Sequence, residues 1–127
     1  MSGYVIGIDV GKSTFHLVAT DQAGNIVQKK RFSRPQLLNH LANASSNVLA
    51  MEACPGAHCL AKALVETGHA VKLIPPQYVR PYVKTNKNDF VDAEAIAEAV
   101  QRPTMRFVQV KTDAQLDLQA LHLERPF

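Results

Sequence analysis

Tryptophan is absent from this chain of 127 residues, and cysteine occurs only twice. Cys54 and Cys59 are too few for a disulfide framework, and together with His58 they lack the second pair of ligands that a structural zinc site needs. We therefore interpret both as reduced thiols near the start of a helix.

Long hydrophobic runs are also missing, since no segment approaches the roughly 18 apolar residues that a membrane helix needs. The first residues lead directly into a predicted strand, which leaves no room for a signal peptide. We expect a cytoplasmic protein without a membrane partner. With 46% hydrophobic residues, the sequence predicts one compact domain around a single core.

Acidic residues are missing from two basic stretches, although the formal net charge is only +3. The first stretch, residues 22–51, contains Lys29, Lys30, Arg31 and Arg34. Clusters of this kind can contact phosphates. A charged run is also simply a solvated face in many proteins, and we favour that interpretation for Lys29 to Arg31 alone.

The second basic stretch, residues 75–88, contains three cations and no acid: Arg80, Lys84 and Lys87. Tyr78 and Tyr82 lie among these cations, and aromatic faces beside cations suit nucleic acid. A tyrosine in a loop is as often a packing residue. The stretch leads directly to Asp89, which strengthens the nucleic-acid interpretation.

Hydrophobic periodicity predicts strands over residues 3–10, 13–20, 26–32, 48–52 and 69–74. It predicts helices over residues 35–44, 55–68, 77–83 and 89–101, an extended piece over 106–110, and a last helix from a capping box at 112–115. Three antiparallel strands followed by alternating helix and strand are typical of the ribonuclease H-like α/β fold, a mixed sheet with helices on both faces.

Four carboxylates lie where predicted elements begin or end. Asp9 and Glu52 close the first and fourth strands, and Asp89 and Asp92 share one face if their segment is helical. In the predicted fold the first strand is central, so Asp9 and Glu52 lie side by side and an acidic helix completes the group. Because like charges repel, a divalent cation is the natural reason to gather them.

Each acid also has a simpler explanation. Asp89 can be the N-cap of its helix, and Asp92 can belong to the exposed side of that helix. Asp9 can lie in a turn, and Glu52 can pair with a lysine or cap the next helix. The presence of all four favours the metal site.

Five runs together carry a family resemblance: residues 7–12 (GIDVGK), 51–53 (MEA), 56–58 (GAH), 68–71 (GHAV) and 87–93 (KNDFVDA). In this order they resemble the N-terminal domain of the DEDD transposases of bacterial insertion sequences, the insertion-sequence one-ten family. That family is related to the Piv-type invertases, and its catalytic domain is similar to the RuvC Holliday-junction resolvases.

The resemblance implies a bacterial, Mg²⁺-dependent transposase that cleaves and exchanges DNA strands, with Mn²⁺ as a possible substitute. The implied catalytic and metal-binding tetrad is Asp9, Glu52, Asp89 and Asp92. Hypothetical phosphate contacts are Lys12, Arg80, Lys84 and Lys87. Implied partners are DNA, an element-encoded guide RNA and, in the full-length enzyme, further copies of the protein.

Members of this family continue into a C-terminal domain that carries a serine acting with the tetrad. We therefore expect residues 1–110 to form the RuvC-like catalytic domain and residues 111–127 to begin a truncated helical segment. On this interpretation the chain is not competent alone.

Two alternatives remain open. The Gly7-x-Asp9-x-Gly11-Lys12 run is also compatible with the first phosphate loop of an actin-like or sugar-kinase-like ATPase, but a second phosphate loop is missing and the later acids go unexplained. The other alternative is a truncated remnant that binds nucleic acid without catalysing a reaction.

Overall fold

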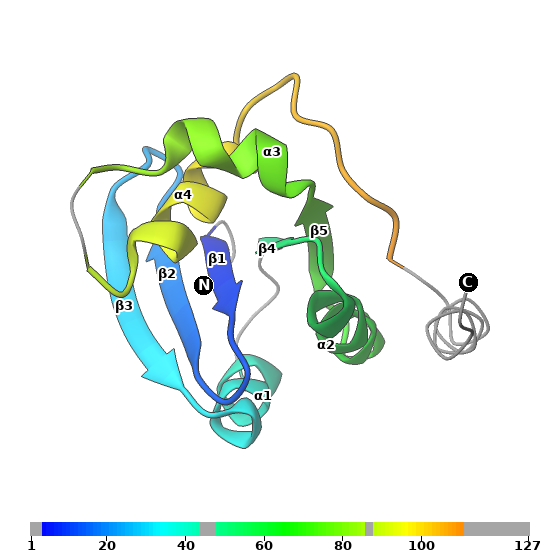
Figure 1. Ribbon diagram of the computed structural model, residues 1–127. Helices are drawn as coiled ribbons and strands as arrows, with labels where there is room; N and C mark the ends of the chain where they lie inside the picture. Colours follow the sequence, from blue (N-terminus) through cyan, green and yellow to red (C-terminus); the bar gives the residue numbers. More distant parts are fainter. Residues whose placement is uncertain (1–3, 44–47, 86–87, 111–127) are drawn as a thin grey trace, which may run out of the picture.

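The structure is a computed structural model that describes residues 4–43, 48–85 and 88–110 (Figure 1). Its five strands are β1 (Val5–Val10), β2 (Phe15–Thr20), β3 (Ile26–Phe32), β4 (Val48–Glu52) and β5 (Ala70–Ile74). They form one sheet in the order β3-β2-β1-β4-β5. The β1–β2 and β2–β3 pairs are antiparallel, whereas β4 pairs in parallel with β1 and β5. The predicted mixed sheet with a central first strand is confirmed.

The helices in this part of the chain are α1 (Arg34–Ala42), α2 (Pro55–Glu66), α3 (Pro76–Val79) and α4 (Val91–Ala99), with a 3-10 turn η1 (Arg80–Tyr82) after α3. Ser33 caps α1 in a capping box with Gln36, which satisfies two backbone N–H groups that a helix start leaves free. Gly68, with φ of 95°, follows α2 in the left-handed region that favours glycine.

The sheet separates two hydrophobic cores, one on each of its faces. Ile6, Ile8 and Leu49 pack on the side covered by α1 and α2. Ala50 and Ile74 pack on the other side, against Val79 of α3 and Ile96 of α4. The central strands are therefore covered on both faces, as predicted, and Figure 1 shows α1 and α2 away from α3 and α4.

Several boundaries differ from the sequence prediction, and two of them adjoin predicted site residues. β2 starts at Phe15 rather than at residue 13, so the β1–β2 connection spans residues 11–14. α4 starts at Val91 rather than at Asp89, because the Asn88 side chain accepts a hydrogen bond from the Phe90 backbone N–H and holds residues 88–90 in a turn. The predicted last helix lies outside the described residues.

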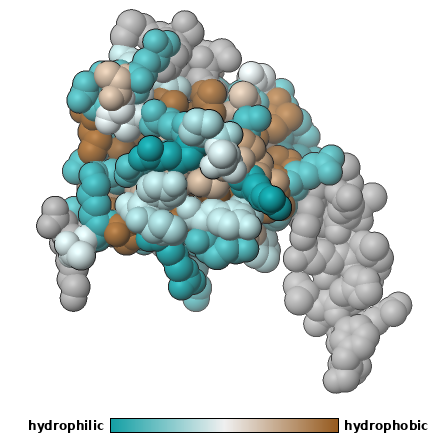
Figure 2. Space-filling model, turned by 90° about the horizontal axis from the view of Figure 1, so that it is seen from above, coloured by the Kyte–Doolittle hydropathy of each residue, from teal (hydrophilic) through white to brown (hydrophobic). Residues whose placement is uncertain are grey.

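Residues 106–110 were expected to be extended, and there Val108 forms one antiparallel bridge to Leu73 of β5. Seen from above, hydrophobic residues interrupt the hydrophilic surface in separate groups (Figure 2). None of the helices in the described ranges has the length and apolar content needed to cross a membrane.

Candidate active site beside the central strands

Asp9 and Glu52 are neighbours on one face of the sheet. In the β1–β4 register Ile8 pairs with Met51, so the next residues along these parallel strands, Asp9 and Glu52, also lie side by side. Both side chains lie on the face of the sheet that α4 covers, not on the face that α1 and α2 cover, and both are half-buried. Asp9 is thus partly enclosed beneath α4.

A glycine allows α4 to approach this face closely. A side chain at Gly7 would collide with the backbone oxygen of Ala93 and would stand 2.7 Å from the backbone nitrogen of Ala97. The α4 residues in contact are themselves small, so helix and strand meet almost backbone to backbone. This close packing brings Asp92, in the first turn of α4, to the carboxylates of β1 and β4.

Electrostatics show that these three acids are within interacting range. Burial raises the pKa of Asp9, and repulsion from Asp92 raises it further, whereas His16 lowers it. Burial also raises the pKa of Glu52, with added repulsion from Asp92 and Asp9, and Arg80 opposes the rise. Three elements distant in sequence therefore place negative charge in one region.

A groove of about 360 Å³ opens beside two of the acids. Glu52 and Asp92 line it together with Arg80 of η1 and the apolar side chains of Val79 and Val83. Arg80 is the predicted phosphate-contacting cation that lies with the acids.

His16 is a site residue that the sequence interpretation missed. It pairs with Asp9 across the β1–β2 ladder and so lies on the same face of the sheet. Its ring packs edge-on against Phe90 at 5.2 Å between centroids, and its Nε2 atom is buried without a hydrogen-bond partner in the structure. The sequence pattern contained a signal for its face: Thr14, His16 and Val18 alternate with Phe15 and Leu17 and therefore lie on the other side of the strand.

Asp89 is less closely associated with the other acids. It lies exposed in the turn before α4, and it does not contribute to the pKa shifts of Asp9 or Glu52. Among residues 4–43, 48–85 and 88–110, no three His, Cys, Asp or Glu side chains are close enough to share one metal ion. The structure thus brings Asp9, Glu52 and Asp92 together as a loose group.

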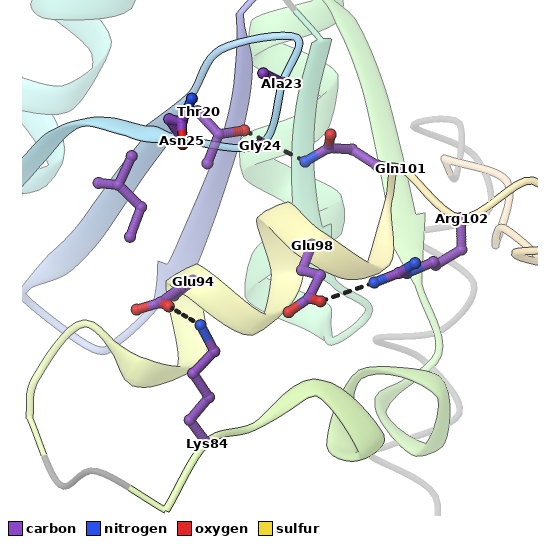
Figure 3. Close-up of a pocket in the computed structure, with 10 residues that line it drawn as sticks. Thr20, Ala23, Gly24, Asn25, Lys84, Glu94, Glu98, Gln101 and Arg102 are labelled. Carbon is purple, nitrogen blue, oxygen red and sulfur yellow. Dashed lines mark hydrogen bonds and ion pairs between the residues drawn. The ribbon is translucent and has the colours of Figure 1, made fainter.

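Two other predicted phosphate contacts, Lys84 and Lys12, lie elsewhere. Lys84 forms a 2.6 Å ion pair with Glu94, and this pairing raises the pKa of Lys84. Figure 3 shows this pair in a different pocket, of about 620 Å³, where Glu98 also pairs with Arg102. Lys12 is exposed in the β1–β2 connection, and Lys87 lies outside the described residues.

Comparison with curated proteins gives relatives that are longer than this chain. The chain is 52% identical over 121 residues to the transposase for insertion sequence element IS1328 of Yersinia enterocolitica, covering 95% of the chain and 36% of the relative. It is 44% identical over 117 residues to the transposase for insertion sequence element IS1111A of Coxiella burnetii, covering 92% and 32%. The chain therefore spans about a third of the length of these relatives.

Solved structures identify the fold. Thermus thermophilus RuvC in complex with a Holliday junction substrate superposes with a TM-score of 0.58 at 12% identity, covering 84% of this chain and 99% of that one. A second T. thermophilus RuvC structure gives a TM-score of 0.56 at 17% identity, covering 83% and 99%. The predicted ribonuclease H-like, RuvC-like fold is confirmed.

A family model described as a transposase, that of the DEDD transposases of the IS110 type, matches residues 6–126. The match includes all five runs that carried the resemblance, together with both strands and the helix that hold the clustered acids. The chain belongs to the IS110-type DEDD transposase family.

Proposed function

We propose that this chain is the catalytic domain of a DNA transposase, in which Asp9, Glu52 and Asp92 act in metal-dependent strand cleavage and exchange, with Asp89 as the fourth acid. The observation that carries the proposal is the convergence of three acids from β1, β4 and α4 on one face of the sheet. Family membership supports the reaction, and the DNA complex of a RuvC structural neighbour supports DNA as the substrate.

The donor set fits a divalent cation by its chemistry. Carboxylate oxygens are the hard ligands that Mg²⁺ prefers. Burial raises the pKa of Asp9 and Glu52 and repulsion among the acids raises it further, and a cation relieves that repulsion. When bound, such an ion would stabilise negative charge on the attacking and leaving phosphodiester oxygens. Asp9 is central because Glu52 lies beside it, Asp92 lies above it and His16 lies on its other side.

The chain's own groups would then orient the substrate. Arg80 lines the groove with Glu52 and Asp92, where its guanidinium is suited to a phosphate oxygen. We extend the proposal to Mg²⁺ as the working ion, to residues 1–110 as the catalytic domain, and to a complete protein that acts in the cytoplasm as an oligomer with a guide RNA.

A titration with Mg²⁺ or Mn²⁺ tests the site. We expect a saturable rise in the Tm of the purified chain that is lost in Asp9→Asn and in Asp92→Asn. Glu98→Gln is the matched control, because Glu98 lies on the same helix as Asp92 but pairs with Arg102 in the other pocket. A response that survives both aspartate substitutions would contradict the proposed site.

Catalysis itself is tested in the complete transposase that contains this sequence. Asp9→Asn should abolish DNA strand cleavage while the protein remains folded. Cleavage at the wild-type rate by this variant would refute the assignment, and an isolated chain without any metal response would favour the non-catalytic, nucleic-acid-binding alternative.

A further inference from the structure

The three consecutive cations of β3 divide between the two faces of the sheet. Lys29 lies 5.9 Å from the centre of the Phe90 ring, just before α4, so it projects on the side of the acids. Lys30 lowers the pKa of His40 in α1, as a second cause after burial, so it projects on the opposite side. By alternation Arg31 returns to the side of Lys29.

The strand register aligns Arg31 with the candidate site. Arg31 pairs with His16, and His16 pairs with Asp9, beside which Glu52 lies on β4. A single transverse row therefore runs from a cation on the outer strand, through an imidazole, to the two central carboxylates. Adjacent strands are about 4.8 Å apart, so Arg31 is about 10 Å from Asp9 across the sheet.

Among the described residues some cations form ion pairs, whereas others, including Lys29, Lys30 and Arg31, do not. Lys84, Arg102 and Lys62 each form an ion pair with a glutamate. Within the described ranges, no carboxylate lies within ion-pair distance of Lys29 or Arg31, and Lys29 instead lies over the Phe90 ring. Their positive charge is therefore available to an external anion.

We propose that Lys29 and Arg31 form a phosphate-binding track on β3 that leads one DNA strand across β2 to the acids. The inference rests on the proposed function, because it assigns the approach of the substrate to that site. A distance of about 10 Å corresponds to about three nucleotides at 3.4 Å of rise per strand. The track replaces the interpretation of residues 29–31 as a uniformly solvated face.

The test compares two variants of equal charge change in the 127-residue chain. Lys29→Gln/Arg31→Gln removes both cations of the track, whereas Lys30→Gln/Lys62→Gln removes two cations from β3 and α2 on the opposite side of the sheet. Binding to a fluorescein-labelled DNA duplex is followed by fluorescence anisotropy over a series of KCl concentrations. Circular dichroism confirms that each variant is folded, and Arg31→Lys, which keeps the charge, should bind nearly as the wild type does.

The track predicts that the slope of log Kobs against log salt becomes shallower by about 2 in Lys29→Gln/Arg31→Gln, since each phosphate contact contributes about 0.9. The slope of the control variant should stay near the wild-type value. Equal losses in the two variants, or an absence of DNA binding by the wild type, would overturn the proposal. Stronger competition by RNA than by DNA of the same sequence would overturn the choice of DNA.

One further variant separates this inference from the proposed function. Asp9→Asn removes negative charge near the track, so it should bind DNA at least as tightly as the wild type. If the track variant loses binding while the complete transposase carrying Asp9→Asn still cleaves DNA, the track stands and the catalytic assignment fails. If the track variant binds normally while Asp9→Asn abolishes cleavage, the reverse holds.

Discussion

Asp9 is held among groups with opposing effects. Burial and the nearby Asp92 favour its protonated form, whereas His16, directly across the β1–β2 ladder, favours its ionised form. Glu52 experiences the same burial and repulsion from Asp92, opposed by Arg80. Both carboxyls are thus destabilised as anions in the metal-free protein, which is the electrostatic condition expected of a cation site.

This condition predicts how stability depends on pH. Because the pKa values of Asp9 and Glu52 are raised on folding, the folded state binds more protons than the unfolded chain as these groups titrate. The free energy of unfolding should therefore fall as the pH rises from below the ordinary carboxyl pKa values through the raised ones. In Asp9→Asn, which lacks one of these groups, the fall should be smaller.

Thermal melts between about pH 3.5 and pH 7, in buffer with a chelator, measure this effect. Glu98→Gln serves as the control and should follow the wild-type profile. Parallel profiles for wild type and Asp9→Asn would show that Asp9 is not destabilised by folding.

At the scale of helices and strands, Gly7 sets the distance between α4 and the sheet. A methyl group there would meet the α4 backbone at Ala93 and Ala97, and neither backbone group can turn aside as a flexible side chain can. We expect Gly7→Ala to lower the free energy of unfolding by about 1 to 3 kcal/mol or more, and to move Asp92 away from Asp9.

Chemical denaturation measures this loss, with Gly56→Ala as the control. A methyl group at Gly56 would stand 3.6 Å from the Val10 side chain, an ordinary contact, and alanine favours the helix that Gly56 occupies. Gly56→Ala should therefore be neutral or slightly stabilising. A Gly7→Ala variant as stable as the Gly56→Ala variant would show that the helix has room to move.

Local patterns made most of the elements predictable. β3 and β4 have the predicted bounds, because turn residues precede β3 and Pro55 follows soon after β4. Ser33 caps α1 as expected. The start of α4 was placed two residues early, because the side-chain acceptor at Asn88 competes with helix formation. That difference removes Asp89 from the helix face assigned to it.

Cross-strand partners were harder to obtain from the sequence. A two-residue turn at residues 11–12 would pair Asp9 with Thr14, whereas the observed four-residue connection pairs Asp9 with His16. Both registers leave Asp9 and His16 on the same face of the sheet, so that shared face could be predicted while the direct pairing of Asp9 with His16 could not. Alternation alone divides Lys29 and Lys30 between the faces, but which of them lies on the side of the acids likewise depends on the observed register of β3.

For the whole molecule, the sheet order implies a gradient of stability. β1 is central, pairs with β2 and β4, and is covered on both faces, whereas β3 is an outer strand with mostly exposed side chains. Native-state hydrogen exchange should therefore be slowest for β1 amides and faster for β3 amides that lack a partner strand. Exchange measured by NMR residue by residue tests this order, and equal protection of β1 and β3 would contradict it.

The cations of β3 also affect how copies of the protein can associate. An outer strand with unpaired backbone groups is a template for pairing with another chain, and adjacent lysine and arginine side chains on both faces oppose such pairing by mutual repulsion. At the other edge, the backbone N–H of Val108 already donates a hydrogen bond to the carbonyl oxygen of Leu73 in β5. Any association between copies of this chain is therefore expected to use surfaces other than a sheet continued from one copy to the next.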